Sequence, residues 1–270
     1  MKIAALQTVS GSQLPANLDT AYGLLAEAAR AGAELAVLPE YFCLMGQRDA
    51  DKLAVREAFG QGQVQSFLAA TARELGLWIV GGTLPLVADS PQHVRNTSLA
   101  FSPQGECVAR YDKIHLFCYD NGRGEQYDES RVIEAGGAPQ AFTLPSRDGQ
   151  AWRVGLSVCY DLRFPELYRA LQADLLLVPS AFTHGTGQAH WEILLRARAI
   201  ENLAYVAAPA QGGRHDNGRR TWGHSMVVDP WGAVLAQREE EGAGVVVAQL
   251  AWERLQQVRA QLPALQHRVL

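Results

Sequence analysis

Residues 154–169 read VGLSVCYDLRFPELYR and join a buried strand to the start of a helix. The apolar run from Val154 to Val158 is typical of a strand inside a sheet. Pro165 suits the first turn of a helix, where its missing N–H costs no hydrogen bond. Cys159 lies between the two, near helix-terminal N–H groups that favour a thiolate. Taken alone, this pattern leaves two interpretations open, a catalytic thiol and a buried structural cysteine.

The composition predicts a protein with a large core and an acidic surface. The 270 residues are 48% hydrophobic and carry a formal net charge of −4. No segment approaches the ~18 consecutive apolar residues of a membrane span, and the N-terminal MKIAALQT is too polar for a signal peptide. Basic stripes interleaved with aromatic residues are also missing from the sequence. We therefore expect a cytoplasmic protein that binds neither nucleic acid nor membranes.

Cysteines and histidines do not follow the patterns of metal sites. Cys43, Cys107, Cys118 and Cys159 are irregularly spaced, which fits neither a disulfide framework nor a CxxC site. The histidines match no HExxH or paired-ligand pattern. We therefore expect no metal and no other cofactor.

Strand-like and helix-like segments alternate along the chain. Continuous apolar runs predict strands at residues 2–8, 33–41, 77–86, 173–182 and 204–213. Helical periodicity predicts helices at residues 17–31, 64–75, 189–204 and 252–262. Turn residues predict one hairpin within 96–109, and a closing hairpin of 224–237 and 244–250 with its turn at 229–232. Alternation combined with hairpins predicts an α/β protein with mixed sheets in a single domain, residues 1–270.

Three polar residues lie at or near the ends of apolar segments: Glu40, Lys113 and Cys159. In layered α/β folds such ends gather at one edge, where sites form. A thiol with an ordinary pKa of ~8.5 is only a few per cent thiolate at neutral pH. A carboxylate can accept its proton, and an ammonium group can stabilise charge that develops on a carbonyl oxygen. Without the cysteine, Glu40 and Lys113 would be interpreted as a plain ion pair.

Four separated segments resemble, in order, the signature segments of the nitrilase (carbon–nitrogen hydrolase) superfamily. They are LPEYF (38–42), YDKIHLF (111–117), YDES (127–130) and SVCYDLRFPELYR (157–169). CYDLRFPEL, AHWEILLRARAIEN (189–202) and GHSMVVDPWG (223–232) are most similar to the Nit branch. Members of that branch act on deaminated glutathione and on ω-amides of 2-oxo acids.

The resemblance implies a fold and an activity. The fold is a four-layer α-β-β-α sandwich with two mixed β-sheets, commonly assembled as a homodimer or higher homo-oligomer. The activity is that of a cysteine-dependent amidase, which cleaves the C–N bond of a small anionic amide through a thioester. QGGRH (211–215) favours deaminated glutathione as substrate. The alternatives are an ω-amidase acting on 2-oxoglutaramate, an N-carbamoyl or nitrile hydrolase, and a catalytically idle partner-binding protein.

The resemblance also assigns roles to individual residues. Cys159 is the nucleophile and Glu40 is the general base. Lys113 and the backbone N–H of Tyr160 bind the oxyanion. Glu129 lies beside the lysine and helps to position the site.

Several further residues are candidates for contact with the substrate. Asp161 and Arg163 either pair or order the turn after the cysteine. Alternatively, Arg163 binds a substrate carboxylate, because guanidinium suits bidentate recognition. Phe182 and Thr183 follow a predicted strand and are expected to line the pocket. Residues 212–220 contain glycine and arginine, and we interpret them as a mobile loop that either meets an acidic substrate or is merely solvated.

Overall fold

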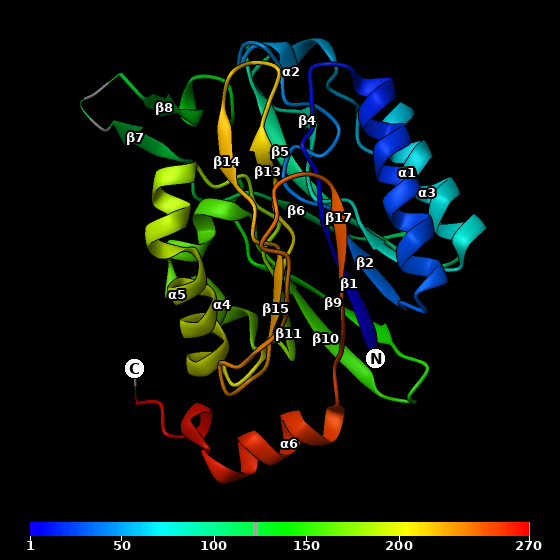
Figure 1. The fold of residues 1–270 in the computed structure, drawn as a ribbon, viewed down its shortest axis with the longest axis vertical. Coiled ribbons are helices and arrows are strands. Elements are labelled where there is room, and N and C mark those ends of the chain that lie inside the picture. Colours follow the sequence, from blue (N-terminus) through cyan, green and yellow to red (C-terminus); the bar gives the residue numbers. More distant parts are fainter. Residues whose placement is uncertain (121, 123, 270) are drawn as a thin grey trace.

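Two β-sheets lie face to face in the computed structural model, which describes residues 1–120, 122 and 124–269. Helices α1 (Leu14–Arg30) and α3 (Gln63–Leu75) cover the outer side of one sheet, and α4 (Pro165–Leu171) and α5 (His184–Asn202) cover the other (Figure 1). This arrangement confirms the four-layer α-β-β-α sandwich.

The first sheet has seven strands in the order β17-β1-β2-β3-β5-β4, with β6 paired to β5. The strands are β1 (Lys2–Gln7), β2 (Leu35–Val37), β3 (Trp78–Val80), β4 (Leu84–Val87), β5 (Val94–Phe101), β6 (Cys107–Asp112) and β17 (Gly244–Gln249). Strands β1, β2 and β3 are parallel and are connected through α1 and α3, whereas the other pairings are antiparallel.

The second sheet has six strands in the order β16-β15-β12-β11-β10-β9. They are β9 (Gln140–Pro145), β10 (Ala151–Leu156), β11 (Leu175–Leu177), β12 (Tyr205–Ala208), β15 (Met226–Val228) and β16 (Val234–Gln237). Strands β10, β11 and β12 are parallel, with α4 and α5 as their crossovers. Both sheets are therefore mixed, as predicted.

Short elements complete the chain. They are α2 (Asp51–Ala54), β7 (Cys118–Asp120), β8 (Gln126–Asp128), β13 (Gly212–Arg214), β14 (Arg220–Trp222), α6 (Trp252–Gln261) and the 3₁₀ turns Glu129–Arg131, Cys159–Arg163 and Ala264–Gln266. No helix among the described residues is long and apolar enough to span a membrane.

Two predictions about local structure are wrong. Residues 212–222 form the β13–β14 hairpin instead of a loop without regular structure. The segment 244–250 does not extend the closing hairpin, which consists of β15 and β16 around the turn at 229–232. It crosses instead to the first sheet as β17 and pairs with β1, Ile3 opposite Ala248.

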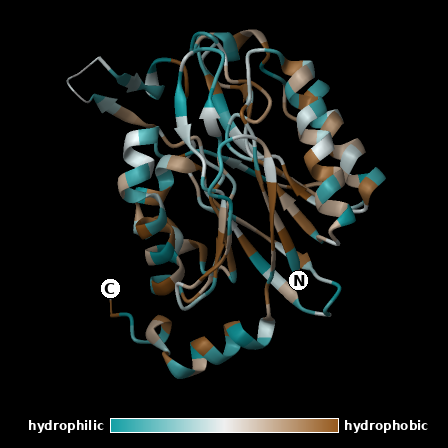
Figure 2. Cartoon of the chain, viewed as in Figure 1, coloured by the Kyte–Doolittle hydropathy of each residue, from teal (hydrophilic) through white to brown (hydrophobic). Residues whose placement is uncertain are grey.

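The core occupies both sides of the first sheet. Ile3 and Ala5 of β1 face the second sheet, whereas Ala4 and Leu6 pack with residues of α1 and α3. Both faces of such a strand are apolar, which explains its continuous hydrophobic run. Hydrophobic colours follow the strands between the helical layers in Figure 2. Parallel strands that are buried on both faces can bring polar groups together only beyond their ends.

Candidate active site

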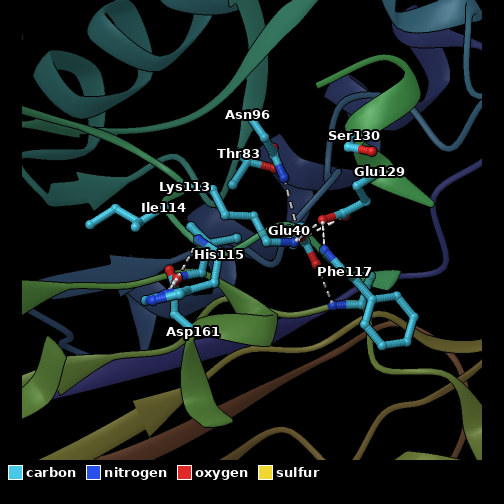
Figure 3. Close-up of polar contacts among 12 residues, drawn as sticks. Glu40, Thr83, Asn96, Lys113, Ile114, His115, Phe117, Glu129, Ser130 and Asp161 are labelled. Atoms are coloured by element: carbon cyan, nitrogen blue, oxygen red, sulfur yellow. Dashed lines mark hydrogen bonds and ion pairs between the residues drawn. The ribbon is translucent and has the colours of Figure 1, made fainter. Parts of the chain in front are cut away.

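Lys113 lies between two carboxylates, just beyond the ends of strands β2 and β6. It follows β6, and its Nζ donates to Glu40 Oε1 at 2.9 Å and to Glu129 Oε2 at 2.8 Å (Figure 3). Glu40 follows β2, and Glu129 opens a 3₁₀ turn after β8. Lys113 and Glu40 are each only 1% exposed. The fold thus gathers three predicted site residues from distant segments into one buried cluster.

Three donors hold the Glu40 carboxylate. Besides Lys113, the Asn96 side chain donates to Oε1 and the Ala181 backbone N–H donates to Oε2, each at 3.0 Å. Asn96 lies on β5, and Ala181 follows β11 in the second sheet. Both carboxylate oxygens of Glu40 therefore have fixed directions, set by groups from both sheets.

The charges of this cluster shift one another's pKa. Burial alone would lower the pKa of Lys113, but the Glu129 and Glu40 carboxylates hold it above its ordinary value. Burial would likewise raise the pKa of Glu129, but Lys113 and hydrogen bonds from Phe117 and Tyr41 hold it below its ordinary value. Lys113 is therefore a cation, and Glu129 an anion, at neutral pH.

Cys159 begins its 3₁₀ turn in the left-handed backbone conformation, with φ of 51°. Its N–H donates to the carbonyl of Pro179 at 3.0 Å. Burial raises the pKa of its thiol well above the ordinary value, the Glu40 carboxylate raises it further, and Lys113 opposes them. This direction favours the protonated thiol over the thiolate at neutral pH. Helix α4 starts at Pro165, as predicted, and Cys159 lies in the 3₁₀ turn between β10 and this helix.

The turn that carries Glu40 is also shaped by unusual backbone geometry. Tyr41 has a φ of 58°, and its hydroxyl donates to Glu129 at 2.7 Å. Gly82 packs so closely on this turn that a Cβ there would lie 2.0 Å from the carbonyl oxygen of Pro39. Strained backbone is common at functional sites, where the surrounding structure maintains it.

A hollow of about 240 Å³ opens beside the Cys159 side chain. Its lining includes the four predicted substrate-contact residues, Tyr160, Arg163, Phe182 and Thr183. It also includes Phe117, Ala181 and Thr186, which the sequence analysis did not single out. Phe117 closes the YDKIHLF segment and could have been found from that position.

Arg163 faces this hollow and does not pair with Asp161. Its guanidinium lies 5.7 Å from the centre of the Phe182 ring and within 3.3 Å of His190 Nδ1. Asp161 instead accepts the backbone N–H of Val158 at 2.8 Å, which orders the turn from within. Asp161 thus orders the turn as predicted, whereas its predicted pairing with Arg163 is wrong, and the Arg163 guanidinium lies at the hollow.

Residues 2–260 match the carbon–nitrogen hydrolase family, and the chain belongs to this family of hydrolases, which act on C–N bonds other than peptide bonds. A protein of Synechocystis sp. named deaminated glutathione amidase is 44% identical over 98% of this chain and 97% of its own.

Two solved structures share the fold. The NitFhit protein of Caenorhabditis elegans superposes with a TM-score of 0.89 at 37% identity, over 99% of this chain and 65% of that longer one. Nit3 of Saccharomyces cerevisiae, a member of branch 10 of the nitrilase superfamily, superposes with a TM-score of 0.86 at 28% identity. The superposition covers 100% of this chain and 97% of Nit3. The family and fold that the motifs indicated are confirmed. Among the described residues, no group of three or more His, Cys, Asp or Glu side chains is arranged to hold a metal ion.

Proposed function

We propose that this chain is a cysteine-dependent amidase whose substrate is deaminated glutathione. The observation that carries the proposal is the buried Glu40–Lys113–Glu129 cluster beside a protonated thiol. These groups provide a base, an oxyanion donor and a nucleophile. The name of the Synechocystis relative supports the choice of substrate.

Acylation begins when Glu40 accepts the thiol proton of Cys159. The Sγ atom then forms a bond to the amide carbonyl carbon, and the carbonyl electrons move to oxygen. Lys113 and the backbone N–H of Tyr160 stabilise this oxyanion, a contribution typically worth ~10²–10³ in rate per donor. When the oxyanion collapses, the C–N bond breaks, and the leaving amine takes the proton from Glu40.

Deacylation uses the same carboxylate. Glu40 accepts a proton from water while the water oxygen attacks the thioester carbonyl. The C–S bond then breaks, the carboxylic acid product leaves, and the proton returns to the Cys159 sulfur. Glu129 acts through Lys113, because it keeps the ammonium charged and directed toward the oxyanion.

Arg163 is the proposed partner of the acyl group's carboxylate. Deaminated glutathione carries a 2-oxo acid at its acyl end, and a guanidinium binds such a carboxylate through two hydrogen bonds. Phe182 holds Arg163 through its ring face, and Thr183 offers a hydroxyl at the same wall. 2-Oxoglutaramate has the same acyl group, so an ω-amidase is the competing assignment.

A substrate panel with mass detection tests the proposal. Purified enzyme is given deaminated glutathione, 2-oxoglutaramate, an N-carbamoyl amide and a nitrile. We expect the highest kcat/KM on deaminated glutathione and a 2-oxoglutaryl adduct in the intact mass. Cys159→Ala should lose turnover and adduct, whereas Cys118→Ala, at an exposed thiol on β7, should keep both. Activity confined to nitriles, or undiminished turnover by Cys159→Ala, would reject the proposal.

We also propose that residues 1–270 form one domain and assemble as a homodimer or higher homo-oligomer in the cytoplasm. The hydrophobic cluster between the sheets contains residues from Met1 to Leu255, which supports one domain. Ile193 and Ile200 of α5 are 70% and 46% exposed, and they offer an apolar face. All four cysteines are free thiols, as is usual in a reducing compartment.

Light scattering tests the assembly. Ile193→Glu should reduce the mass to that of a monomer, because it places a charge on the proposed contact. Phe59→Glu, which changes a 52% exposed side chain away from α5, is the control and should keep the wild-type mass. A monomeric wild type would overturn the proposed assembly.

A further inference from the structure

A second and larger groove lies next to the hollow that contains Cys159. It is a wide depression, open to solvent, of about 1130 Å³ between two hairpins that Figure 1 shows at the same end of the molecule, β7–β8 and β13–β14. Its polar lining includes Tyr127, His184, Arg214, Asn217, Arg219 and Arg220. The proposed reaction mechanism uses none of these side chains.

The groove and the hollow share their dividing wall. Tyr127 of the groove packs on Phe117 of the hollow, with ring centres 5.8 Å apart. The backbone N–H of Trp222, at the end of β14, donates to the backbone carbonyl of Phe182 at 3.0 Å. Thr183 lines the hollow, and the next residue, His184, lines the groove. The hollow and the groove are therefore neighbouring depressions, separated by the packed rings of Phe117 and Tyr127.

Arg219 provides the groove with an available positive charge. Its guanidinium lies 4.8 Å from the centre of the Tyr127 ring, which holds it at the wall nearest to the hollow. It is also close enough to Tyr41 to oppose the rise in the pKa of that hydroxyl caused by burial and Glu129. None of the ion pairs found among the described residues includes Arg219, whose charge instead lies beside Tyr127 and opposes the rise in the pKa of the Tyr127 hydroxyl caused by burial.

The other charges of the groove divide into neutralised and available groups. Arg220 pairs with Glu241 at 2.7 Å, so its charge is already balanced. The Glu125 carboxylate accepts the Tyr127 hydroxyl at 3.1 Å. Arg214, which is exposed, lies opposite Arg220 in the β13–β14 register. The groove therefore combines an acidic group with two arginines that can meet an anion.

We propose that Arg219, supported by Arg214, binds the terminal carboxylate of the leaving group. This inference rests on the proposed function, since the leaving group of deaminated glutathione is a dipeptide that ends in a carboxylate. Two extended residues span at most about 7 Å, and the groove is the depression that adjoins the hollow across the Phe117–Tyr127 pair. The substrate then has one carboxylate at Arg163 and the other at Arg219. An amide that releases ammonia gains nothing from the groove, so Arg219 determines specificity.

The test compares two substrates that share an acyl group. Arg219→Gln should raise KM for deaminated glutathione about tenfold to a hundredfold, the range for a lost hydrogen bond to a charged group. The ratio of kcat/KM values between deaminated glutathione and 2-oxoglutaramate should fall by the same factor. Arg219→Lys should recover part of the ratio. Arg220→Gln removes an equal charge from a residue already paired with Glu241 and should preserve the ratio.

Changing the substrate isolates the contact itself. Wild-type enzyme should bind the C-terminal carboxamide of deaminated glutathione about as weakly as Arg219→Gln binds the natural carboxylate. For Arg219→Gln, the two forms of the substrate should have the same KM. An unchanged ratio in a folded Arg219→Gln protein would overturn this inference and leave the proposed function standing. A wild type that cleaves no deaminated glutathione would overturn both.

Discussion

The hydroxyl of Tyr111 donates a 2.7 Å hydrogen bond to the buried carboxylate of Asp161. Tyr111 lies two residues before Lys113, and Asp161 lies two residues after Cys159. His115, on the other side of the lysine, contacts the same carboxylate through Nδ1 at 2.7 Å. Figure 3 shows His115 and Asp161 next to the Lys113 cluster. Asp161 thus ties the lysine segment to the cysteine turn.

Loss of this tie should impair both stability and turnover. Tyr111→Phe keeps the ring and removes a hydrogen bond to a charged group, which is worth about 1.5–3 kcal/mol of unfolding free energy. We expect a lower kcat as well, because Lys113 and Cys159 are no longer held at a fixed separation. Urea unfolding and steady-state kinetics measure the two effects.

Tyr168→Phe is the matched control. Tyr168 is also fully buried, but its hydroxyl bonds to the neutral Ser157 hydroxyl at 2.8 Å. This variant should lose about 1 kcal/mol and keep more of its kcat. Equal kinetic losses in the two variants would show that Tyr111 has only a general packing role.

Removal of the Lys113 charge should destabilise the fold strongly. Lys113→Met leaves Glu40 and Glu129 buried without their shared cation, and breaking a buried ion pair in this way costs about 3–5 kcal/mol. Lys113→Met with Glu129→Gln should regain much of the stability but no turnover, since the oxyanion donor is still missing. Denaturant unfolding measures the stability of both variants, and amide hydrolysis measures their turnover. A Lys113→Met protein as stable as wild type would contradict this prediction.

Glu129 should contribute to the acid limit of stability. Its pKa is lower in the folded protein than its ordinary value of 4.5. The stabilisation is therefore fully present above pH ~4.5 and is lost as pH falls through the folded-state pKa. Glu129→Gln should be less stable than wild type at pH 7, and the gap should narrow toward pH 3. Unfolding free energies of both proteins measured across this pH range test the prediction. A difference between wild type and Glu129→Gln that widens at low pH would refute it.

The Glu40 carboxylate should disfavour the thiolate form of Cys159 and yet be needed for amide turnover. Its carboxylate helps burial to raise the pKa of Cys159. Glu40→Gln should therefore shift iodoacetamide alkylation of Cys159 to lower pH, although amide turnover is lost with the base. Intact-mass kinetics between pH 6 and pH 10 measure the profile. An alkylation profile displaced to higher pH in Glu40→Gln would contradict the arrangement.

Most strands and helices could be predicted from the sequence because their side-chain periodicity is local. Which strand pairs with which in a sheet could not be predicted in this way. Residues 244–250 are apolar on both faces, and nothing in that pattern distinguishes β1 in the other sheet from the adjacent β16. The β13–β14 hairpin was missed because its glycines and arginines are typical of a loop, and the sequence left open whether residues 212–220 meet an acidic substrate or are merely solvated.

The candidate site divides in the same way. By itself, the sequence determined the layered α/β class, and it predicted Glu40, Lys113, Glu129 and Cys159 as site residues, since they stand in recognisable segments at or near strand ends. Tertiary structure alone decided which groups surround them, among them Asn96, Ala181 and Asp161, and which groove lies next to the hollow. The physical reason is that a side chain's type is encoded locally, whereas its hydrogen-bond partners, burial and pKa depend on segments brought together only when the two sheets pack.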